Sequence, residues 1–354
     1  MTAHRTATGI LGTALLATTV LLSGCATADA EPGASEDTEA ASLGDLTLQL
    51  PWILNSQFIG EYLAVDEGYF AEAGLDSVNL VPGPSSAVSE VLSGAADIGM
   101  ADAMTIGSII ANESAPVKII ASTYQKNPYS VLSLDTEDAI RTPEDMIGKK
   151  IGVQDVNTVL FNALLSANDI APDEVEIVPV SYDPSPLILG EVDGYMSFLT
   201  NESILVRAEG HDAVDMAFAD NGLPFVADAI IATDEMIEAE PEKLKAFLEG
   251  EIRGYTEALR DPQKGIDLMM AQTGTDLGLD AANELLCAEA ANELLIVTDE
   301  TAENGLFTTS ETLQEQTVGT LETAGMTVAA EDMFDMSLLA EVYAEHPELI
   351  DYAG

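Results

Sequence analysis

A short polar loop around residue 52 carries the side chains best suited to hold a small flat molecule. Trp52 offers a ring for stacking, while Asn55 and Gln57 offer amide groups that can fix the orientation of a ligand. Apolar alternation before this loop predicts a strand over residues 45–51, and helical spacing after it predicts a helix over residues 57–70. Because open α/β sheets bind ligands outside the carboxyl ends of their strands, we expect the loop to border a binding pocket. The alternative is that Trp52 is an ordinary core residue.

Similar side chains recur after other predicted strands. The further candidate ligand-binding residues are Ser85, Ser86, Asp102, Tyr129, Asn157, Thr158, Tyr182, Tyr195, Phe198, Asn201 and Glu202. Aromatic and amide side chains dominate this set, which favours a flat heterocycle held by stacking and a few fixed hydrogen bonds. Alternatives stay open, because the two serines can simply cap the next helix, Phe198 can be core, and Glu202 can face solvent instead of a ligand amino group.

The balance of charge argues against several classes of partner. The 354-residue chain has 62 acidic residues against 12 Lys and Arg, a formal net charge of -50, and such a surface repels nucleic acid and anionic lipid headgroups. Residues 45–117 contain no Lys or Arg, and the bases near the proposed cleft are at most Lys126 and Arg207. A neutral or weakly cationic ligand therefore fits better than an anion, although helix N-termini can bind anions without a cation.

Residue types that support catalysis are sparse. His211 and His346 stand alone, with no nucleophile near them in sequence and no second residue at a metal-binding spacing. Cys287 lies in an apolar stretch typical of a buried helix face, so we expect no catalytic thiol there. The sequence therefore predicts a binding protein without enzyme activity, metal or cofactor.

The elements that position these side chains alternate between strand and helix, which predicts an α/β protein with two lobes. The first lobe is predicted over residues 45–135 and 228–354, with strands at 45–51, 77–82, 97–101 and 117–122 and helices at 57–70, 85–93 and 104–112. The second lobe is predicted over residues 139–225, with strands at 150–154, 175–181, 194–198 and 214–219. Crossovers at residues 126–139 and 226–233 would form a hinge on which the lobes close.

A weak internal repeat supports two lobes of similar design. Residues 94–100 and 190–196 share the spacing of Gly, Asp and Met, and each copy is predicted to end a helix and begin a strand. A Pro-Ser pair precedes each copy, at Pro84 and at Pro184. The alternative is chance similarity.

The N-terminus has the pattern of an exported lipoprotein. His4 and Arg5 precede an uncharged apolar run over residues 10–22, which is too short to span a bilayer as a mature helix. The run is followed by a lipobox that predicts a signal peptide over residues 1–24 and lipidation of Cys25. Residues 25–44 are small and acidic, so we expect a disordered tether on the extracytoplasmic face of the cell membrane. The alternative is a cytoplasmic protein with an apolar start.

The Trp52 loop and the residues after it resemble the opening of the solute-binding proteins of ABC importers. The similar residues are Trp52 with Asn55, Gly60, Tyr62-Leu63-Ala64, Glu67-Gly68-Tyr69-Phe70, Ala73-Gly74-Leu75 and Gly83-Pro84. Residues 141–153 resemble the family's entry into its second lobe, and the resemblance extends from about residue 46 to about residue 270. Within the family, the chain is most similar to the branch associated with thiamine pyrimidine precursors, next to the binders of sulfonates, nitrate and riboflavin.

This resemblance implies a type II periplasmic-binding-protein fold, in which two lobes close on a small molecule and deliver it to an ABC permease and its ATPase. The ligand it implies first is a thiamine pyrimidine precursor, with riboflavin second and a sulfonate such as taurine, or nitrate, as the alternative. A ligand-binding sensory lipoprotein is a further alternative. So is an enzyme like the eukaryotic pyrimidine synthases, which depend on a cysteine-rich motif that this sequence lacks. We expect a monomer that meets the membrane through its lipid anchor only.

Overall fold

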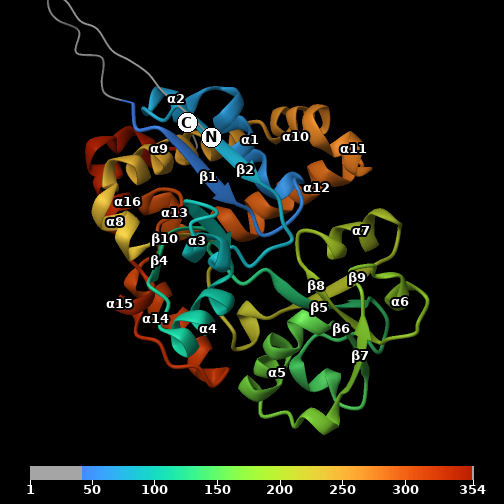
Figure 1. Cartoon of the computed structure of the whole chain (residues 1–354). Helices are drawn as coiled ribbons and strands as arrows, with labels where there is room; N and C mark the ends of the chain where they lie inside the picture. Colours follow the sequence, from blue (N-terminus) through green and yellow to red (C-terminus); the bar gives the residue numbers. More distant parts are fainter. Residues whose placement is uncertain (1–41, 353–354) are drawn as a thin grey trace, which may run out of the picture. The chain divides into compact units, whose positions relative to one another are not determined.

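The apolar strands assemble into two five-stranded sheets in the computed structural model, which describes residues 42–352 (Figure 1). The first sheet, in the order β2-β1-β3-β10-β4, contains β1 (Asp45–Gln49), β2 (Ser77–Val81), β3 (Ile98–Ala101), β4 (Val117–Tyr124) and β10 (Ala227–Thr233). The second sheet, in the order β7-β6-β8-β5-β9, contains β5 (Tyr129–Leu134), β6 (Lys150–Gln154), β7 (Glu176–Val180), β8 (Gly194–Phe198) and β9 (Ala213–Ala217). The predicted α/β class with two lobes is confirmed, and we call the part built on each sheet the first and the second lobe.

In each sheet, the strand through which the chain arrives from the other sheet is antiparallel to its neighbours, and the remaining paired strands are parallel. In the first sheet β1 is parallel to β2 and β3, while β10 is antiparallel to β3 and β4. In the second sheet β6 is parallel to β7 and β8, while β5 is antiparallel to β8 and β9. Because parallel strands end at the same edge, the loops after β1, β2 and β3 share one edge of the first sheet, and those after β6, β7 and β8 share one edge of the second.

The two connections between the sheets differ from the prediction. Residues 125–128 lead from β4 into β5, and residues 218–226 lead from β9 into β10. Tyr129–Leu134, predicted to belong to the first lobe, is strand β5 of the second sheet, so the predicted boundary at residue 135 is wrong. Ala227–Thr233 is a strand of the first sheet and not a crossover. The prediction fails here because alternation within a strand does not say which sheet the strand joins.

Helices connect the strands of both sheets. Those of the first lobe before β4 are α1 (Ile59–Asp66), α2 (Tyr69–Glu72), α3 (Val88–Ser93) and α4 (Ala103–Glu113), and those of the second lobe are α5 (Thr158–Ala167), α6 (Ser185–Ile188) and α7 (Glu202–Ala208). The helix predicted over residues 57–70 is divided, because the 3-10 turn η1 (Ser56–Phe58) precedes α1 and Gly68 separates α1 from α2. Neither Ser85 nor Ser86 is the N-cap of α3, which is Ala87.

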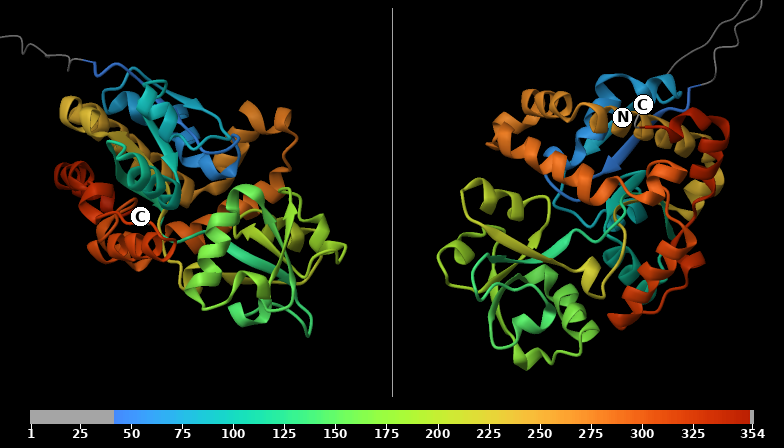
Figure 2. Two further views of the ribbon diagram at one scale, coloured as in Figure 1. Left: turned by 60° about the horizontal axis from the view of Figure 1, so that its bottom comes forward. Right: turned by 180° about the vertical axis from the view of Figure 1, so that it is seen from behind.

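The chain after β10 is helical, as predicted from its amphipathic spacing. Its helices are α8 (Asp234–Ala239), α9 (Pro241–Arg260), α10 (Pro262–Met269), α11 (Thr275–Leu277), α12 (Ala281–Ala291), α13 (Asp299–Asn304), α14 (Glu311–Thr323), α15 (Ala330–Met333) and α16 (Ser337–Glu345). Helix α9 packs along α1, and α16 packs on α9 and β4; Figure 2 shows this gold and red layer beside the blue elements of the first sheet. Helix α12 differs, because it contacts both η1 of the first lobe and α7 of the second.

The internal repeat is present in three dimensions. Asp97 accepts a hydrogen bond from the backbone N–H of Thr47 in β1 (2.7 Å), and Asp193 accepts one from the backbone N–H of Lys150 in β6 (2.8 Å). Gly94 and Gly190 both have left-handed backbone conformations, with φ of 72° and 70°. Each copy therefore ends a helix and ties the turn before the following strand to a parallel neighbour of that strand, β1 in the first sheet and β6 in the second, which chance similarity does not explain.

The predicted signal peptide over residues 1–24, the lipidation site Cys25 and nearly all of the predicted tether over residues 25–44 lie outside the described residues. Among residues 42–352, no helix combines the length and the apolar character needed to cross a membrane.

Candidate ligand-binding site

A cavity of about 490 Å³ lies where loops from both lobes meet, within the volume range of small-molecule sites. The loops after β1, β2 and β3 contribute from the first lobe, those after β6, β7 and β8 from the second, and α12 closes one side. The predicted residues that line it are Trp52, Asn55, Gln57, Ser85, Ser86, Asp102, Tyr129, Asn157, Tyr182, Phe198, Asn201 and Glu202. Carboxyl ends of parallel strands thus converge on one hollow, as expected for an open α/β sheet.

Trp52 is half-buried on the wall of this cavity and is not part of the closed core. Its ring lies 5.1 Å from that of Tyr182, at an interplanar angle of 60°, so one loop from each lobe meets here. Asn55 caps η1 by accepting a hydrogen bond from the backbone N–H of Gln57 (3.2 Å), which holds the loop in place.

A second group of rings lines the cavity beyond Trp52. Tyr129 meets Phe198 edge-on at 5.3 Å, and Tyr124 lies 6.3 Å from the same ring. The Tyr129–Phe198 pair has the edge-to-face geometry that aromatic rings prefer, and the Tyr124–Phe198 pair is tilted.

Two predicted residues do not line the cavity. Tyr195 is fully buried beneath the second sheet, where it packs with Leu132 and Val206, and its hydroxyl donates to the carbonyl oxygen of Ser181 (2.5 Å). It stands three positions before Phe198 on β8, and because side chains alternate along a strand the two residues point to opposite faces. Thr158 begins α5 and is half-buried outside the cavity, next to the lining residue Asn157.

Glu202 lies at the start of α7, with one carboxylate oxygen accepting from the backbone N–H of Phe198 (2.8 Å). Only 4% of the residue is exposed, and burial raises the pKa of its carboxyl to about 7. The carboxylate therefore faces the cavity in a poorly hydrated setting.

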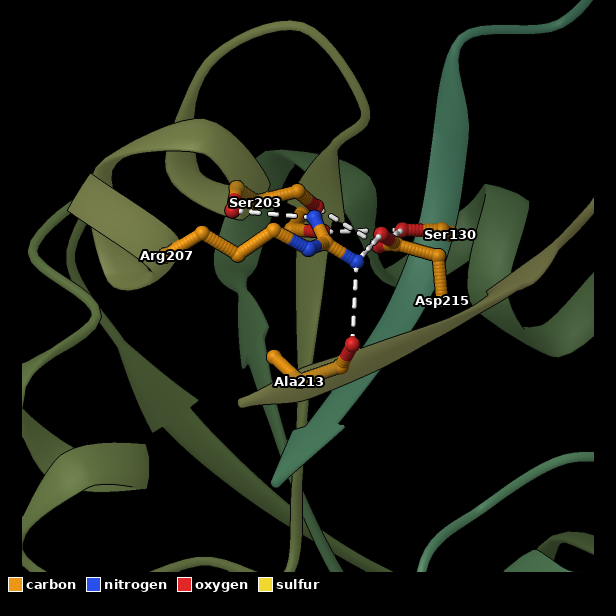
Figure 3. Close-up of polar contacts among 6 residues, drawn as sticks. Ser130, Ser203, Arg207, Ala213 and Asp215 are labelled. Carbon is orange, nitrogen blue, oxygen red and sulfur yellow. Dashed lines mark hydrogen bonds and ion pairs between the residues drawn. The ribbon is translucent and has the colours of Figure 1, made fainter. Parts of the chain in front are cut away.

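A polar network fixes α7 on the second sheet, as Figure 3 shows. Asp215 accepts hydrogen bonds from the hydroxyls of Ser130 and Ser203, each at 2.6 Å. Arg207 donates to Asp215 (2.6 Å) and to the carbonyl oxygen of Ala213 (3.1 Å). Arg207 is thus committed to this network and does not line the cavity, which removes one of the two bases considered for an anionic ligand.

Asp228 is the principal lining residue that sequence analysis missed. It is 6% exposed and has a φ of 45°, a strained value for a residue with a side chain. The amide of Gln57 donates to its Oδ2 (2.6 Å), and burial raises the pKa of Asp228 to about 7. No sequence signal identifies it, because it lies inside a buried apolar strand, 171 positions from Gln57.

Helix α12 supplies three further lining residues that were missed as ligand contacts, Glu284, Cys287 and Ala291. Glu284 accepts from the backbone N–H of Ser56 (2.8 Å), which ties α12 to the Trp52 loop. Cys287 is buried as predicted, yet it lines the cavity. Burial, with Glu284 and Glu202 nearby, raises the pKa of its thiol to about 12, so the thiol stays protonated and unreactive at neutral pH. Other missed lining residues are Tyr124, Gln154 and Thr200.

The charged side chains of described residues that line the cavity are all acidic. Its lining contains Asp102, Glu202, Asp228 and Glu284 but, among the residues described, no Lys, Arg or His. Lys126 is exposed and does not line the cavity. Nor do the described residues include a cluster of three or more His, Cys, Asp or Glu side chains able to hold a metal ion.

A family described as "NMT1/THI5 like" matches residues 55–265, which is more than half of the chain. The chain belongs to this family. It is 25% identical over 249 residues to the formylaminopyrimidine-binding protein of Halalkalibacterium halodurans, covering 69% of this chain and 74% of that protein. It is 25% identical over 239 residues to the riboflavin-binding protein RibY of Chloroflexus aurantiacus, covering 65% of this chain and 66% of that protein.

Enzymes also occur among the relatives of this NMT1/THI5-like chain. The 4-amino-5-hydroxymethyl-2-methylpyrimidine phosphate synthase THI12 of Saccharomyces cerevisiae is 25% identical over 237 residues, covering 63% of this chain and 69% of that protein. Among solved structures, the periplasmic aliphatic sulphonate-binding protein SsuA of Escherichia coli aligns with a TM-score of 0.59 at 14% identity, covering 77% of this chain and 90% of that one. This likeness confirms the predicted periplasmic-binding-protein fold.

Proposed function

We propose that this protein is the extracytoplasmic solute-binding component of an ABC importer and that it captures a small, flat nitrogen heterocycle. The observation that carries the proposal is the cavity between the lobes, where aromatic rings stand beside amides and carboxylates with no basic side chain in its described lining. Aromatic walls contribute stacking and burial, while the amides and carboxylates accept hydrogen bonds from ring nitrogens and amino groups. A thiamine pyrimidine precursor is the first candidate and riboflavin the second, supported by the names of the two bacterial relatives.

Anionic ligands fit this cavity poorly. A sulfonate or nitrate would sit among four carboxylates with no base in the described lining, so repulsion would add to the loss of hydration. The protein therefore has the fold of the sulphonate binders, but its cavity does not suit an anionic ligand.

A synthase activity is also a poor fit. The chain has two cysteines, Cys25 and Cys287, and thus no cysteine-rich motif. The cavity thiol of Cys287 is held protonated by its surroundings. We therefore propose a binding protein and no enzyme.

Delivery requires that the ligand be enclosed and then released. We propose that the lobes close by rotation about residues 125–128 and 218–226, the two connections between the sheets. Trp52 and Tyr182, one from each lobe, already lie in contact and would cover the ligand in the closed state. We further propose that Cys25 carries the lipid that keeps this monomer at the membrane, beside a permease and its ATPase.

Calorimetric titration of the purified protein tests the ligand class. The panel is 4-amino-5-hydroxymethyl-2-methylpyrimidine, its formylamino analogue, riboflavin, taurine and nitrate, preceded by mass spectrometry of whatever copurifies. We expect binding of a heterocycle and no heat from taurine or nitrate. Tight binding of taurine or nitrate, with no heat from any heterocycle, would overturn the proposal.

Trp52→Ala tests the site. Stacking contributes on the order of 0.5–1.5 kcal/mol beyond lost burial, so the dissociation constant should rise about tenfold or more. Tyr69→Ala is the matched control, because Tyr69 is a half-buried aromatic residue outside the cavity. Heterocycle binding that survives undiminished in the Trp52 variant would show that the ring does not stack on the ligand.

A further inference from the structure

Two of the cavity's carboxylates have uncommitted hydrogen-bonding capacity, and they come from opposite lobes. Asp228 uses Oδ2 to accept from Gln57, and its Oδ1 has no hydrogen-bond partner among the described residues. Glu202 uses Oε2 to accept from the backbone N–H of Phe198, and apart from its own backbone N–H no other group described in the structure donates to its side chain. By contrast, Asp102 caps α4 with both oxygens on Thr105 (each 2.8 Å).

These two residues are more than nine-tenths buried, with exposures of 6% for Asp228 and 4% for Glu202. Neither Asp228 nor Glu202 has an oxygen among the fully enclosed atoms that lack a partner, so their free capacity opens into the cavity, where a ligand that replaces lost hydration is favoured. Since no Lys, Arg or His among the described lining residues can supply the donor or the charge, the natural complement is a cation with N–H groups. The rings of Trp52, Tyr129 and Phe198 add to this preference, because aromatic faces attract cations.

We propose that the cavity binds its ligand as a flat cation with N–H groups on two edges, one edge held by Glu202 and the other by Asp228. This inference rests on the proposed function and narrows its ligand class. It favours an aminopyrimidine over a flavin, because an aminopyrimidine can carry a proton on a ring nitrogen. A permanently methylated ammonium group would not satisfy the two carboxylates, since it has no N–H to donate.

Binding of such a cation should depend on pH. The titratable groups that interact electrostatically with Asp228 are Asp102, Glu61, Tyr124, Tyr129 and Tyr255, and those that interact with Glu202 are Tyr129, Tyr182, Tyr195 and Cys287. None of these is a base. Because burial holds the pKa of both carboxyls at about 7, both are mostly protonated at pH 6 and mostly ionised at pH 8. A cation must therefore displace protons at pH 6 but few at pH 8. Affinity should therefore rise by about tenfold per carboxyl between these two pH values.

A matched pair of probes tests the proposal. Benzamidine is a flat amidinium cation over this pH range, and benzamide is its neutral counterpart of nearly the same shape. By calorimetry at pH 8, we expect benzamidinium to bind at least about tenfold more tightly than benzamide, which corresponds to about 1.4 kcal/mol. Its dissociation constant should fall from pH 6 to pH 8 while that of benzamide stays constant. Titrations in two buffers of different ionisation enthalpy should show proton release at pH 6 without any variant.

Variants then assign the two edges. Benzamidinium has N–H groups at one end only, so at least one of Asp228→Asn and Glu202→Gln should reduce the preference for benzamidinium about tenfold, and no effect of either would overturn the inference. Glu322→Gln, an exposed acid on α14 outside the cavity, should leave the preference unchanged. Equal binding of the two probes, absence of binding by both, or phenyltrimethylammonium binding as tightly as benzamidinium would each overturn the inference. A protein that binds a panel heterocycle but shows no preference for benzamidinium over benzamide would also overturn it while leaving the proposed function in place. If the protein prefers benzamidinium but binds no heterocycle of the panel, the cation inference is supported and the proposed function is refuted.

Discussion

Replacing Glu61 by Gln should stabilise this protein, and increasingly so as the pH rises. Glu61 on α1 faces Glu251 on α9, and both residues are fully buried. All four carboxylate oxygens lack a hydrogen-bond partner among the described residues. Burial raises the pKa of Glu61 to about 8, and burial together with Glu61 holds the pKa of Glu251 well above its ordinary value.

The sign of the effect follows from which state holds the proton. An unfolded Glu has a pKa of about 4.3, so between that pH and about 8 the unfolded chain releases a proton that folded Glu61 keeps. The stability is therefore fully present below about pH 4 and is lost as the pH rises towards about 8. Each pKa unit corresponds to about 1.4 kcal/mol, so a loss on the order of 3 kcal/mol is expected from pH 5 to pH 8 through Glu61 alone. Gln has nearly the same shape and does not titrate.

Urea unfolding at pH 5, 7 and 8 measures this difference. Glu61→Gln should change the free energy of unfolding little at pH 5 and raise it by about 3 kcal/mol at pH 8. Glu322→Gln is the control, because it removes the same formal charge from an exposed position on α14. An equal gain for both variants would attribute the effect to net charge, and a gain for Glu61→Gln that does not change with pH would refute the buried-proton explanation.

Three further predictions concern packing, anchoring and closure. A Cβ added at Gly254 on α9 would overlap the backbone carbonyl of Gly60 on α1, so Gly254→Ala should lower the free energy of unfolding by about 1–3 kcal/mol. Gly319→Ala, in open space on α14, should instead raise it by about 0.4–1 kcal/mol; similar effects at both positions would disprove close packing of α1 on α9. Cys25→Ser should release the exported protein from membranes on fractionation, and a variant that stays membrane-bound would contradict the lipid anchor. Small-angle scattering should show a smaller radius of gyration on ligand saturation, and an unchanged radius with verified binding would count against closure.

The sequence predicts the framework well where its signals are local. The strands at 150–154 and 194–198 are found as β6 and β8 with the predicted bounds. The repeat predicts a shared turn, and Asp97 and Asp193 tie that turn to β1 and β6, the parallel neighbours of the strands that follow. Most of the predicted loop residues after strand ends line the cavity, because the carboxyl ends of parallel strands converge there. This convergence is common to open α/β sheets, so it can be predicted without knowing the contacts of each residue.

Prediction fails where a residue's role depends on a distant partner. Tyr195 and Phe198 both look like cleft aromatics in sequence, but the alternation of β8 directs only Phe198 to the cavity. Glu284 is 228 positions from Ser56, whose backbone it holds, and no periodicity encodes that contact. Asp228 is missed because an acid within an apolar strand has no distinguishing pattern until its partners are known.

The buried acids among the described residues form two pairs, and only one pair lines the cavity. Glu61 and Glu251 lie below the cavity and do not line it, so their burial brings no ligand contact and reduces stability above acidic pH. Glu202 and Asp228 are also buried and also have raised pKa values, yet each is held by one donor and has a side facing the cavity. Since burial without a base destabilises all four, stability does not explain the second pair. Under the proposal above, a cationic ligand supplies the missing charge and donors, and the anionic cavity is the feature by which this protein selects its ligand.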